Sequence, residues 1–203
     1  MKSFAAITSR RSVLMASAAL GGASVFGLFS RLATAAIGDT IVVKPGKVTI
    51  QRFTDLGKSI GMETVDKVIK TEDEWKKLLA SVPQPQLAFE VTRQEGTEAP
   101  FTGPNWDNHA TTGLYRCICC DNALYDAATK YDSGTGWPSF WEPIQTNALI
   151  LRKDDSIPGE PRVEVLDKCG GHLGHVFDDG PQPTGKRYCM NSIAMYFVPD
   201  KKQ

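Results

Sequence analysis

The sequence lacks an excess of charge of either sign. Its 203 residues include 23 Lys and Arg and 23 Asp and Glu, so the formal net charge is zero. Because a nucleic-acid-binding protein usually shows a basic excess, the composition gives no sign of a nucleic-acid partner. Cysteines are also few: five is an odd number, and too small for a miniprotein held together by disulfides. With 41% apolar residues, the chain reads as one ordinary globular domain with an appendage, or as two small domains.

The first 35 residues contain four basic residues and no acidic one. Arg10 and Arg11 stand directly before a weakly apolar run over residues 15–29, and small residues at 33–35 follow at the spacing of a signal-peptide cleavage site. The paired arginine is typical of the twin-arginine export route. The run is about 15 residues long, shorter than the ~20 that a membrane-spanning helix needs. We therefore expect residues 1–35 to be a signal peptide, with export to the periplasm and no stable membrane contact after cleavage.

The mature chain divides into a leader over residues 36–70, in which we recognise no chemistry, and a domain over residues 71–199. Thr71 and Glu74 fit a capping box at the start of a helix that Pro83 and Pro85 should end, and a second short helix is expected around residues 87–93. From Gly113 onward, Gly and Pro turns separate short β-type runs. These runs lie at residues 114–117, 148–152, 162–166, 175–177 and 187–198. The pattern predicts a mainly β, mostly antiparallel domain with helices at its N-terminal side.

Cys117 and Cys120 have the spacing of a zinc knuckle or of a redox pair. A second knuckle would need a ligand three residues before Cys169, but a leucine stands there. Asp167 or Cys119 would have to complete a tetrahedral site, and the spacing does not choose between them. In an oxidising compartment a structural disulfide between two of these thiols is an alternative.

Cys189 lies in the last β-type run, which we expect to form one strand over residues 187–198. Because side chains alternate along a strand, Arg187, Cys189 and Asn191 should share a face that Ile193 and the apolar residues after it continue. A guanidinium beside the thiol is expected to lower its pKa below the free value of about 8.5 and so favour the nucleophilic thiolate. The alternative is an inert buried cysteine.

Two further features accompany this thiol. His172 and His175 are three residues apart, a spacing that suits either a metal or a pair in which one imidazole donates a proton and the other supports it. Trp137 stands between Gly136 and Pro138 on a stiff turn, where an indole makes an apolar wall for a small substrate group. Ordinary structural roles are the alternative for each of these residues.

Together these motifs closely resemble the methionine sulfoxide reductase B family over about residues 71–199. The matching runs are residues 96–98, 101–103 and 106, residues 115–120, residues 131–140, residues 172–181 and residues 184–192. The resemblance implies two antiparallel sheets and reduction of the R epimer of methionine sulfoxide, peptide-bound or free, in the repair of oxidised proteins. It makes Cys189 the nucleophile and places Trp137 on the substrate methyl group. His172, His175 and Asn191 would then orient the sulfoxide and supply a proton.

The implied reaction leaves a sulfenic acid on Cys189, which another thiol must discharge. A thioredoxin-like thiol reductant is therefore the expected partner, and no organic cofactor is expected. Many relatives carry a resolving cysteine two residues before the tryptophan, where this chain has Thr135. The resolving thiol is then one of the other four cysteines or an external thiol. Zinc-containing relatives have two complete Cys-x-x-Cys pairs, whereas this chain has Leu166 and is one residue short between Val165 and Cys169. Binding of a structural zinc through Cys117, Cys120 and Cys169 therefore stays open.

Two other classes of protein compete with this interpretation. Cys117, Cys120 and Cys169 would also suit a zinc-ribbon-like binding module without catalysis, but that module gives no role to Cys189 or to the turn that carries Trp137. A disulfide oxidoreductase would use the Cys-x-x-Cys pair directly, usually at a helix N-terminus in a βαβ setting, whereas here the pair follows an extended run. The reductase interpretation is therefore favoured.

Overall fold

The computed structural model describes residues 45–54 and 58–200. The predicted signal peptide over residues 1–35 lies outside these ranges, so its prediction stands untested. Within the described ranges no helix has the length and apolar character needed to cross a membrane.

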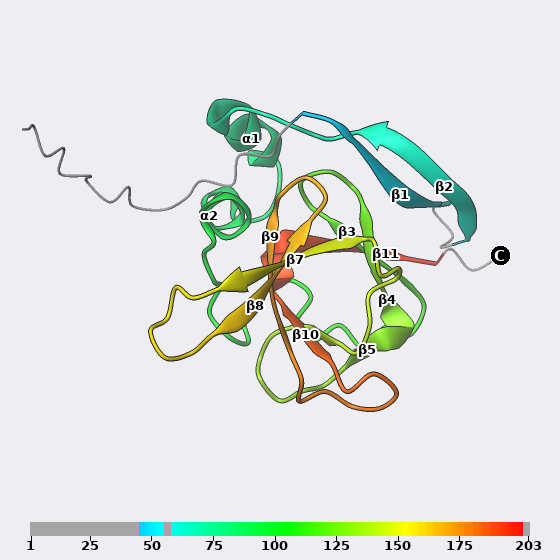
Figure 1. The fold of residues 1–203 in the computed structure, drawn as a ribbon, viewed down its shortest axis with the longest axis vertical. Helices are drawn as coiled ribbons and strands as arrows, with labels where there is room; N and C mark the ends of the chain where they lie inside the picture. The colour runs from blue at the N-terminus through cyan, green and yellow to red at the C-terminus, as the bar shows by residue number, and fades with distance from the viewer. Residues whose placement is uncertain (1–44, 55–57, 201–203) are drawn as a thin grey trace, which may run out of the picture. The chain divides into compact units, whose positions relative to one another are not determined.

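The described part of the chain contains eleven strands in three antiparallel sheets and two short α-helices, which confirms the expected mainly β class (Figure 1). The largest sheet has six strands. In spatial order they are β5 (Lys130–Tyr131), β6 (Ser139–Phe140), β10 (Arg187–Met190), β9 (His172–Phe177), β8 (Arg162–Asp167) and β7 (Leu149–Asp154). The second sheet has three strands. They are β11 (Met195–Pro199), β3 (Gly113–Cys117) and β4 (Ala123–Asp126). These two sheets make up the domain.

The third sheet is a hairpin within the leader, formed by β1 (Lys47–Phe53) and β2 (Ser59–Asp66). Ile60 and Met62 on β2 are more than half exposed. The hairpin thus belongs to the described structure but contributes no side chain to the buried core.

Two helices precede the main sheets. In α1 (Glu72–Leu79) the predicted capping box is present, because Thr71 Oγ1 accepts from the Glu74 backbone N–H at 3.3 Å and Glu74 accepts from the Thr71 N–H at 2.7 Å. Helix α2 (Pro85–Gln94) begins at the proline that we expected to end the first helix. Proline suits the first turn of a helix, where its missing N–H needs no partner. Helix α2 packs against β9 and carries Arg93, whose role is described below.

Aromatic side chains join the two main sheets. Tyr125 of β4 stacks on Phe140 of β6 with ring centroids 4.2 Å apart, and Tyr115 of β3 meets the same ring edge-on at 5.0 Å. All three residues are fully buried. Burial of one such ring stabilises a fold by roughly 1.5–3 kcal/mol. The contact fixes β6, and with it the turn over residues 132–138 that ends at Pro138.

The single strand predicted over residues 187–198 is wrong. Strand β10 ends at Met190, a 3-10 turn follows over Ser192–Ala194, and β11 then enters the other sheet. The buried Glu98 carboxylate stabilises this break by accepting hydrogen bonds from the backbone N–H groups of Ser192 and Ile193. Ile193 and the apolar residues after it therefore do not continue the face that carries Cys189.

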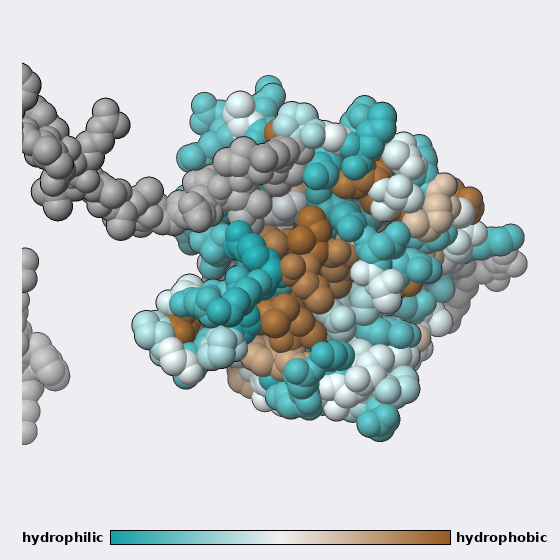
Figure 2. Space-filling view, in the orientation of Figure 1, coloured by the Kyte–Doolittle hydropathy of each residue, from teal (hydrophilic) through white to brown (hydrophobic). Residues whose placement is uncertain are grey.

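On the face that Figure 2 shows, apolar residues gather in one larger patch. In Figure 2 it lies where Figure 1 places β7 and β8. The exposed apolar residues of these strands are Ile150, Leu151 and Val163.

Candidate active site

A row of polar residues crosses the six-stranded sheet. Strand register places Cys189 opposite Ser139 on β6 and opposite His175 on β9, and it places Glu164 of β8 opposite His175 and Arg152 of β7 opposite Glu164. Residues that face each other across an antiparallel pair project from the same side of the sheet, with Cβ atoms about 5 Å apart. The Cβ atoms of Cys189 and His175 are therefore neighbours because of the backbone register.

A bulge brings the second histidine to the same side. Between β8 and β9 the register shifts so that Val165 faces Gly174 and Leu166 faces His172, which leaves Leu173 as an extra residue. A bulge of this kind re-aims a side chain and is common beside active sites. Without it, residues three apart would point to opposite faces. With it, the rings of His172 and His175 lie 5.5 Å apart in an edge-on arrangement.

Glycine is required beside this bulge. A Cβ atom at Gly174 would lie 2.1 Å from the carbonyl oxygen of Cys189 on the neighbouring strand. Only a residue without a side chain allows β9 and β10 to approach so closely. Gly174 therefore permits the spacing that brings Cys189 and His175 together.

Each histidine is held by a carboxylate. His172 Nδ1 lies 2.7 Å from Glu164 Oε1, and His175 Nε2 lies 2.8 Å from Asp154 Oδ2. A carboxylate partner fixes which ring nitrogen carries the proton and leaves the other nitrogen to act on a ligand. The Nε2 atom of the buried His172 has no hydrogen-bond partner within the described structure, and the free nitrogen of His175 is Nδ1. No sequence motif points to Asp154 or Glu164.

The charges around these pairs shape their protonation. Burial lowers the pKa of His175 more than its Asp154 partner raises it. Burial raises the pKa of Asp154, but hydrogen bonds from Ser156 and His175 and the charge of Arg162 outweigh it and hold that pKa well below its usual range. In the free protein His175 is therefore biased towards the neutral imidazole and Asp154 towards the carboxylate.

The environment of Cys189 differs from the expected one. Burial raises the pKa of its thiol, and this outweighs the opposite effects of the Thr135 hydroxyl, the Arg187 charge and the Ser139 hydroxyl. The prediction of a pKa below the free value is therefore wrong, because desolvation of the thiolate is the larger effect. Thr135 Oγ1 is 3.9 Å from Cys189 Sγ, and Ser133 Oγ bridges Thr135 and Ser139 at 2.8 and 2.7 Å.

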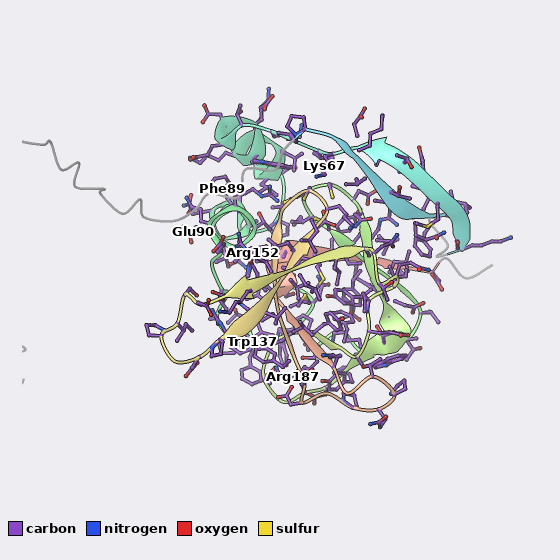
Figure 3. The ribbon with its side chains drawn as sticks, viewed as in Figure 1. Lys67, Phe89, Glu90, Trp137, Arg152 and Arg187 are labelled. Carbon is purple, nitrogen blue, oxygen red and sulfur yellow. The ribbon has the colours of Figure 1, made fainter. Side chains whose placement is uncertain are left out.

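Arg187 is fixed by its own partners. Its guanidinium makes two hydrogen bonds of 2.8 Å to the Asp179 carboxylate and lies 4.3 Å from the centre of the Phe177 ring. A bidentate pair of this geometry holds a guanidinium in one orientation. Arg187, which is labelled in Figure 3, thus presents its charge near Cys189, and Asp179 balances part of that charge.

Asn191 and Trp137 are connected through Glu98. Asn191 is buried, its Oδ1 accepts from the Glu98 backbone N–H at 2.9 Å, and its Nδ2 donates to the Leu173 carbonyl at 3.2 Å. The Glu98 carbonyl in turn accepts from the Trp137 indole N–H at 3.1 Å. Trp137 is half-buried, so part of its ring faces solvent while its polar atom is held. In this structure Asn191 holds the segment that orients the indole.

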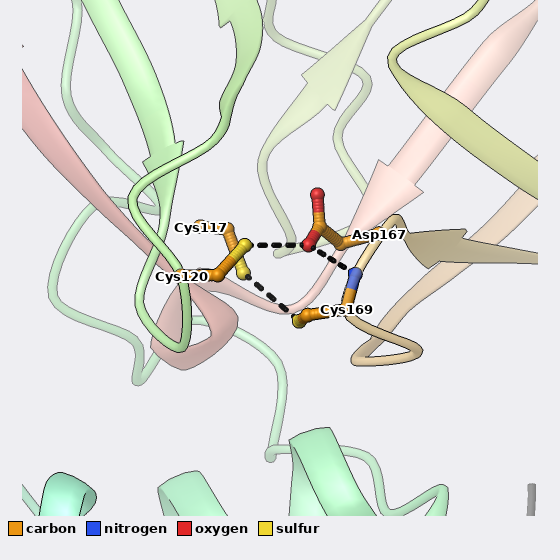
Figure 4. A group of neighbouring side chains, drawn as sticks. All are labelled: Cys117, Cys120, Asp167 and Cys169. Atoms are coloured by element: carbon orange, nitrogen blue, oxygen red, sulfur yellow. Dashed lines mark hydrogen bonds between the residues drawn. The ribbon is translucent and has the colours of Figure 1, made fainter. Parts of the chain in front are cut away.

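A separate cluster unites three cysteines with Asp167 (Figure 4). The ligand atoms of Cys117, Cys120, Asp167 and Cys169 all lie within 4.8 Å of one another. Cys117 Sγ and Cys169 Sγ are 4.0 Å apart, and Cys120 Sγ is 2.8 Å from Asp167 Oδ2. Two sulfurs bound to one tetrahedral zinc at 2.3 Å would be roughly 3.8 Å apart, so the cluster fits a zinc ion.

Asp167 is the fourth potential metal ligand of the cluster. Asp167 is fully buried and points into the group, whereas Cys119, although buried, is not part of it. A carboxylate oxygen lies one atom further from its Cα than a cysteine sulfur, which compensates for the residue missing between Val165 and Cys169. A zinc ion here would cross-link the turn after β3 to the turn after β8. All five cysteines are free, so no disulfide replaces this link.

Arg93 supplies a positive charge beside the cluster, and no sequence motif points to this residue. Its guanidinium donates to Cys169 Sγ at 3.4 Å and to the Cys169 carbonyl at 3.3 Å. The same group lies 4.2 Å from the centre of the Trp75 ring in α1. Hydrogen bonds of this kind orient a metal ligand and stabilise its thiolate form.

The fold and the site together define a SelR domain. Residues 85–199, more than half of the chain, match the family model of that name, and the chain belongs to this family. The resemblance inferred from the motifs is thereby confirmed.

The relatives carry a consistent name. The chain is 54% identical over 126 residues to the chloroplastic peptide methionine sulfoxide reductase B1 of Arabidopsis thaliana, a match that covers 62% of this chain and 59% of that protein. It is 50% identical over 136 residues to the peptide methionine sulfoxide reductase MsrB of Pseudomonas syringae pv. syringae, covering 66% and 98%. It is 42% identical over 167 residues to the mitochondrial methionine-R-sulfoxide reductase B2 of Danio rerio, covering 79% and 89%. The chain thus spans less than two thirds of the chloroplastic relative but nearly all of the Pseudomonas one.

Proposed function

We propose that this protein is a peptide-methionine (R)-S-oxide reductase that repairs oxidised proteins. The observation that carries the proposal is the direct cross-strand pairing of Cys189 with His175, in a chain of the SelR family. A sulfoxide can be reduced by a thiol only if its oxygen is protonated, so a thiol and an acid must lie side by side. A binding module without catalysis would have no use for a thiol paired with a histidine at Cys189 and His175.

In the proposed reaction the Cys189 sulfur attacks the sulfoxide sulfur, and the sulfoxide oxygen takes up a proton. The oxygen ends on Cys189 as a sulfenic acid, and the substrate leaves as methionine. His175 holds the transferred proton at Nδ1, because its Nε2 is engaged by Asp154. Trp137 contacts the substrate methyl group. His172 is buried, with its ring 5.5 Å from that of His175, and supports that imidazole.

The raised pKa of Cys189 suits this chemistry. In the free enzyme the thiol keeps its proton, which protects it from unwanted oxidation. A bound sulfoxide needs one proton for its oxygen, and transfer from the thiol through His175 supplies it while producing the thiolate. Arg187 stabilises that thiolate. A single proton transfer from the Cys189 thiol thus protonates the sulfoxide oxygen and produces the nucleophilic thiolate.

Regeneration requires an outside thiol. On the turn, the Thr135 hydroxyl lies 3.9 Å from Cys189 Sγ, and it is too poor a nucleophile to attack a sulfenic acid. A thiol of a thioredoxin-like reductant would form a mixed disulfide with Cys189 and release water. A second thiol of the reductant would then free Cys189 and leave the reductant oxidised.

The remaining parts of the proposal concern zinc and location. The cluster at Cys117, Cys120, Asp167 and Cys169 can hold a structural zinc ion, whose contribution would be to stability.

The proposed export to the periplasm rests on the sequence of residues 1–35. Replacing Arg10 and Arg11 together by lysine should retain the precursor in the cytoplasm, and normal export of that variant would indicate the general secretory route instead.

The test of the activity uses a purified protein with each epimer of a protein-bound methionine sulfoxide and a thioredoxin-type reductant. The R epimer should be reduced and the S epimer should not. Cys189→Ser should abolish turnover while circular dichroism shows a folded protein, and Cys119→Ser is the matched control. Reduction of neither epimer, or full activity of Cys189→Ser, would overturn the proposal.

A further inference from the structure

Phe101 is an exposed aromatic residue in an unusual backbone conformation. Its side chain is 55% exposed, and its φ of 63° lies in the left-handed region that bulky residues avoid. The Phe101 backbone N–H donates to the Gly136 carbonyl at 2.8 Å, which helps to hold this conformation. Strain of this kind persists only where the surrounding structure enforces it, and it is concentrated at functional sites.

The ring is held from behind by Trp106. The two rings meet edge-on with centroids 5.3 Å apart. Lys130 donates to the Trp106 carbonyl at 3.0 Å, and the Asn105 backbone N–H donates to Ser192 Oγ at 2.6 Å. The segment that carries both rings is therefore anchored at several points, and Phe101 forms a fixed apolar platform.

The platform borders the proposed active site. A Cβ atom built on Gly136 would lie 2.8 Å from the Phe101 ring, so the ring packs against the turn at that residue. On one side of Gly136 is Thr135, whose hydroxyl is 3.9 Å from Cys189 Sγ, and on the other is Trp137. The exposed ring thus lies next to the turn that carries the residues facing the sulfoxide.

We propose that Phe101, supported by Trp106, binds the side chain next to the oxidised methionine in a polypeptide substrate and favours an apolar or aromatic residue there. The inference rests on the proposed reductase function and names a specificity residue for it. A free amino acid has no neighbouring side chain, so a ring outside the contact of Trp137 with the methyl group contributes only to the binding of peptides. Aromatic contacts of this kind change affinity by roughly three- to tenfold.

The experiment compares two R-sulfoxide substrates: a blocked tripeptide with phenylalanine on both sides of the oxidised methionine, and the N-acetylated sulfoxide amino acid. For Phe101→Ala, kcat/KM should fall roughly three- to tenfold on the tripeptide, mainly through KM, and stay unchanged on the amino acid. The matched control is Leu151→Ala, since Leu151 is equally exposed at 55% but lies on β7. Phe101→Gly removes the ring while allowing the left-handed backbone, so it keeps the test valid if the alanine variant folds poorly.

Three outcomes separate the possibilities. An equal loss on both substrates would overturn the inference and make Phe101 a support for the turn that carries Trp137. No loss on either substrate would overturn it as well. A wild-type protein that reduces neither substrate would refute the proposed function, which is a different result from either of these.

Discussion

Cys189 and His175 face each other directly across the adjacent antiparallel strands β10 and β9. Their neighbourhood is set by hydrogen bonds of the main chain and by the absence of a side chain at Gly174, so it does not depend on a flexible loop. A site built on paired strands holds its reacting groups more firmly than a site built on loops.

The first prediction concerns the charge beside the thiol. The charge of Arg187 lowers the pKa of Cys189, although burial raises that pKa by a larger amount. Arg187→Ala should therefore raise the pKa of Cys189. A higher pKa means less thiolate at a given pH, and alkylation by iodoacetamide at pH 8 should therefore slow in the variant. The pH dependence of the alkylation rate measures the shift.

Lys186→Ala is the matched control, because it removes a neighbouring positive charge that is exposed and paired with Asp178. This control should leave the alkylation profile close to that of the wild type. A profile for Arg187→Ala that is identical to the wild type, or shifted to lower pH, would contradict the assigned role of the guanidinium.

The second prediction concerns the indole wall. Trp137→Ala should lower kcat/KM for the R-sulfoxide roughly 30- to 160-fold, which corresponds to about 2–3 kcal/mol for the loss of a large apolar contact. Trp141→Ala is the control, because Trp141 is also half-buried but does not share the hydrogen bond to Glu98. Steady-state kinetics on both variants decides the matter. Unchanged kinetics for Trp137→Ala would return this residue to an ordinary packing role.

Much of this site was accessible from the sequence because its chemistry lies in short motifs. The strand residues around Cys189 and the turn around Trp137 were placed from local spacing, and both helices were expected near their observed positions. The carboxylates Asp154 and Glu164 were not found, since their relation to the histidines depends on strand register and on the bulge at Leu173. Spacing in the chain carries no information about either.

The single strand expected over residues 187–198 failed for a related reason. Alternation of side chains continues through this stretch in the sequence, and local pattern gives no sign of an interruption. The interruption is made by Glu98, about 90 residues earlier in the chain, which accepts from the backbone N–H groups of Ser192 and Ile193. A long-range contact of a buried carboxylate thus overrides the local pattern.

The third prediction concerns the metal. Purified protein should contain one zinc per chain, and Asp167→Asn should lose most of it on dialysis, because the amide is a far weaker ligand than a carboxylate. Arg93→Ala should retain zinc but bind it roughly 10–100-fold more weakly, as is typical when a hydrogen bond to a ligand is removed. Metal analysis and the thermal midpoint are the measurements, and both variants should unfold at lower temperature.

Lys168→Ala is the control for these variants, since Lys168 lies between Asp167 and Cys169 and is not part of the cluster. Asp167→Cys tests the ligand directly, and it should keep zinc if position 167 points at the metal. A full zinc equivalent in dialysed Asp167→Asn would show that the carboxylate is not a ligand.

The last prediction concerns regeneration and follows from the positions of the sulfurs. Cys117 and Cys169 are fully buried in the cluster, and the same sulfur lone pairs that bind zinc would have to attack the sulfenic acid. A zinc-loaded molecule therefore has no free cluster thiol with which to resolve Cys189. After a single turnover with R-sulfoxide and no reductant, we expect one equivalent of sulfenic acid, trapped by a dimedone-type reagent, and no new disulfide in the mass map.

Thr135→Cys should instead give a disulfide with Cys189, because the side chain at 135 already lies beside that sulfur. Cys119→Ser should leave the sulfenic acid yield unchanged, since it removes a buried thiol that is not a ligand. A disulfide from Cys189 to Cys117, Cys120 or Cys169 in molecules that still hold zinc would show that the cluster is mobile enough to take part in the reaction.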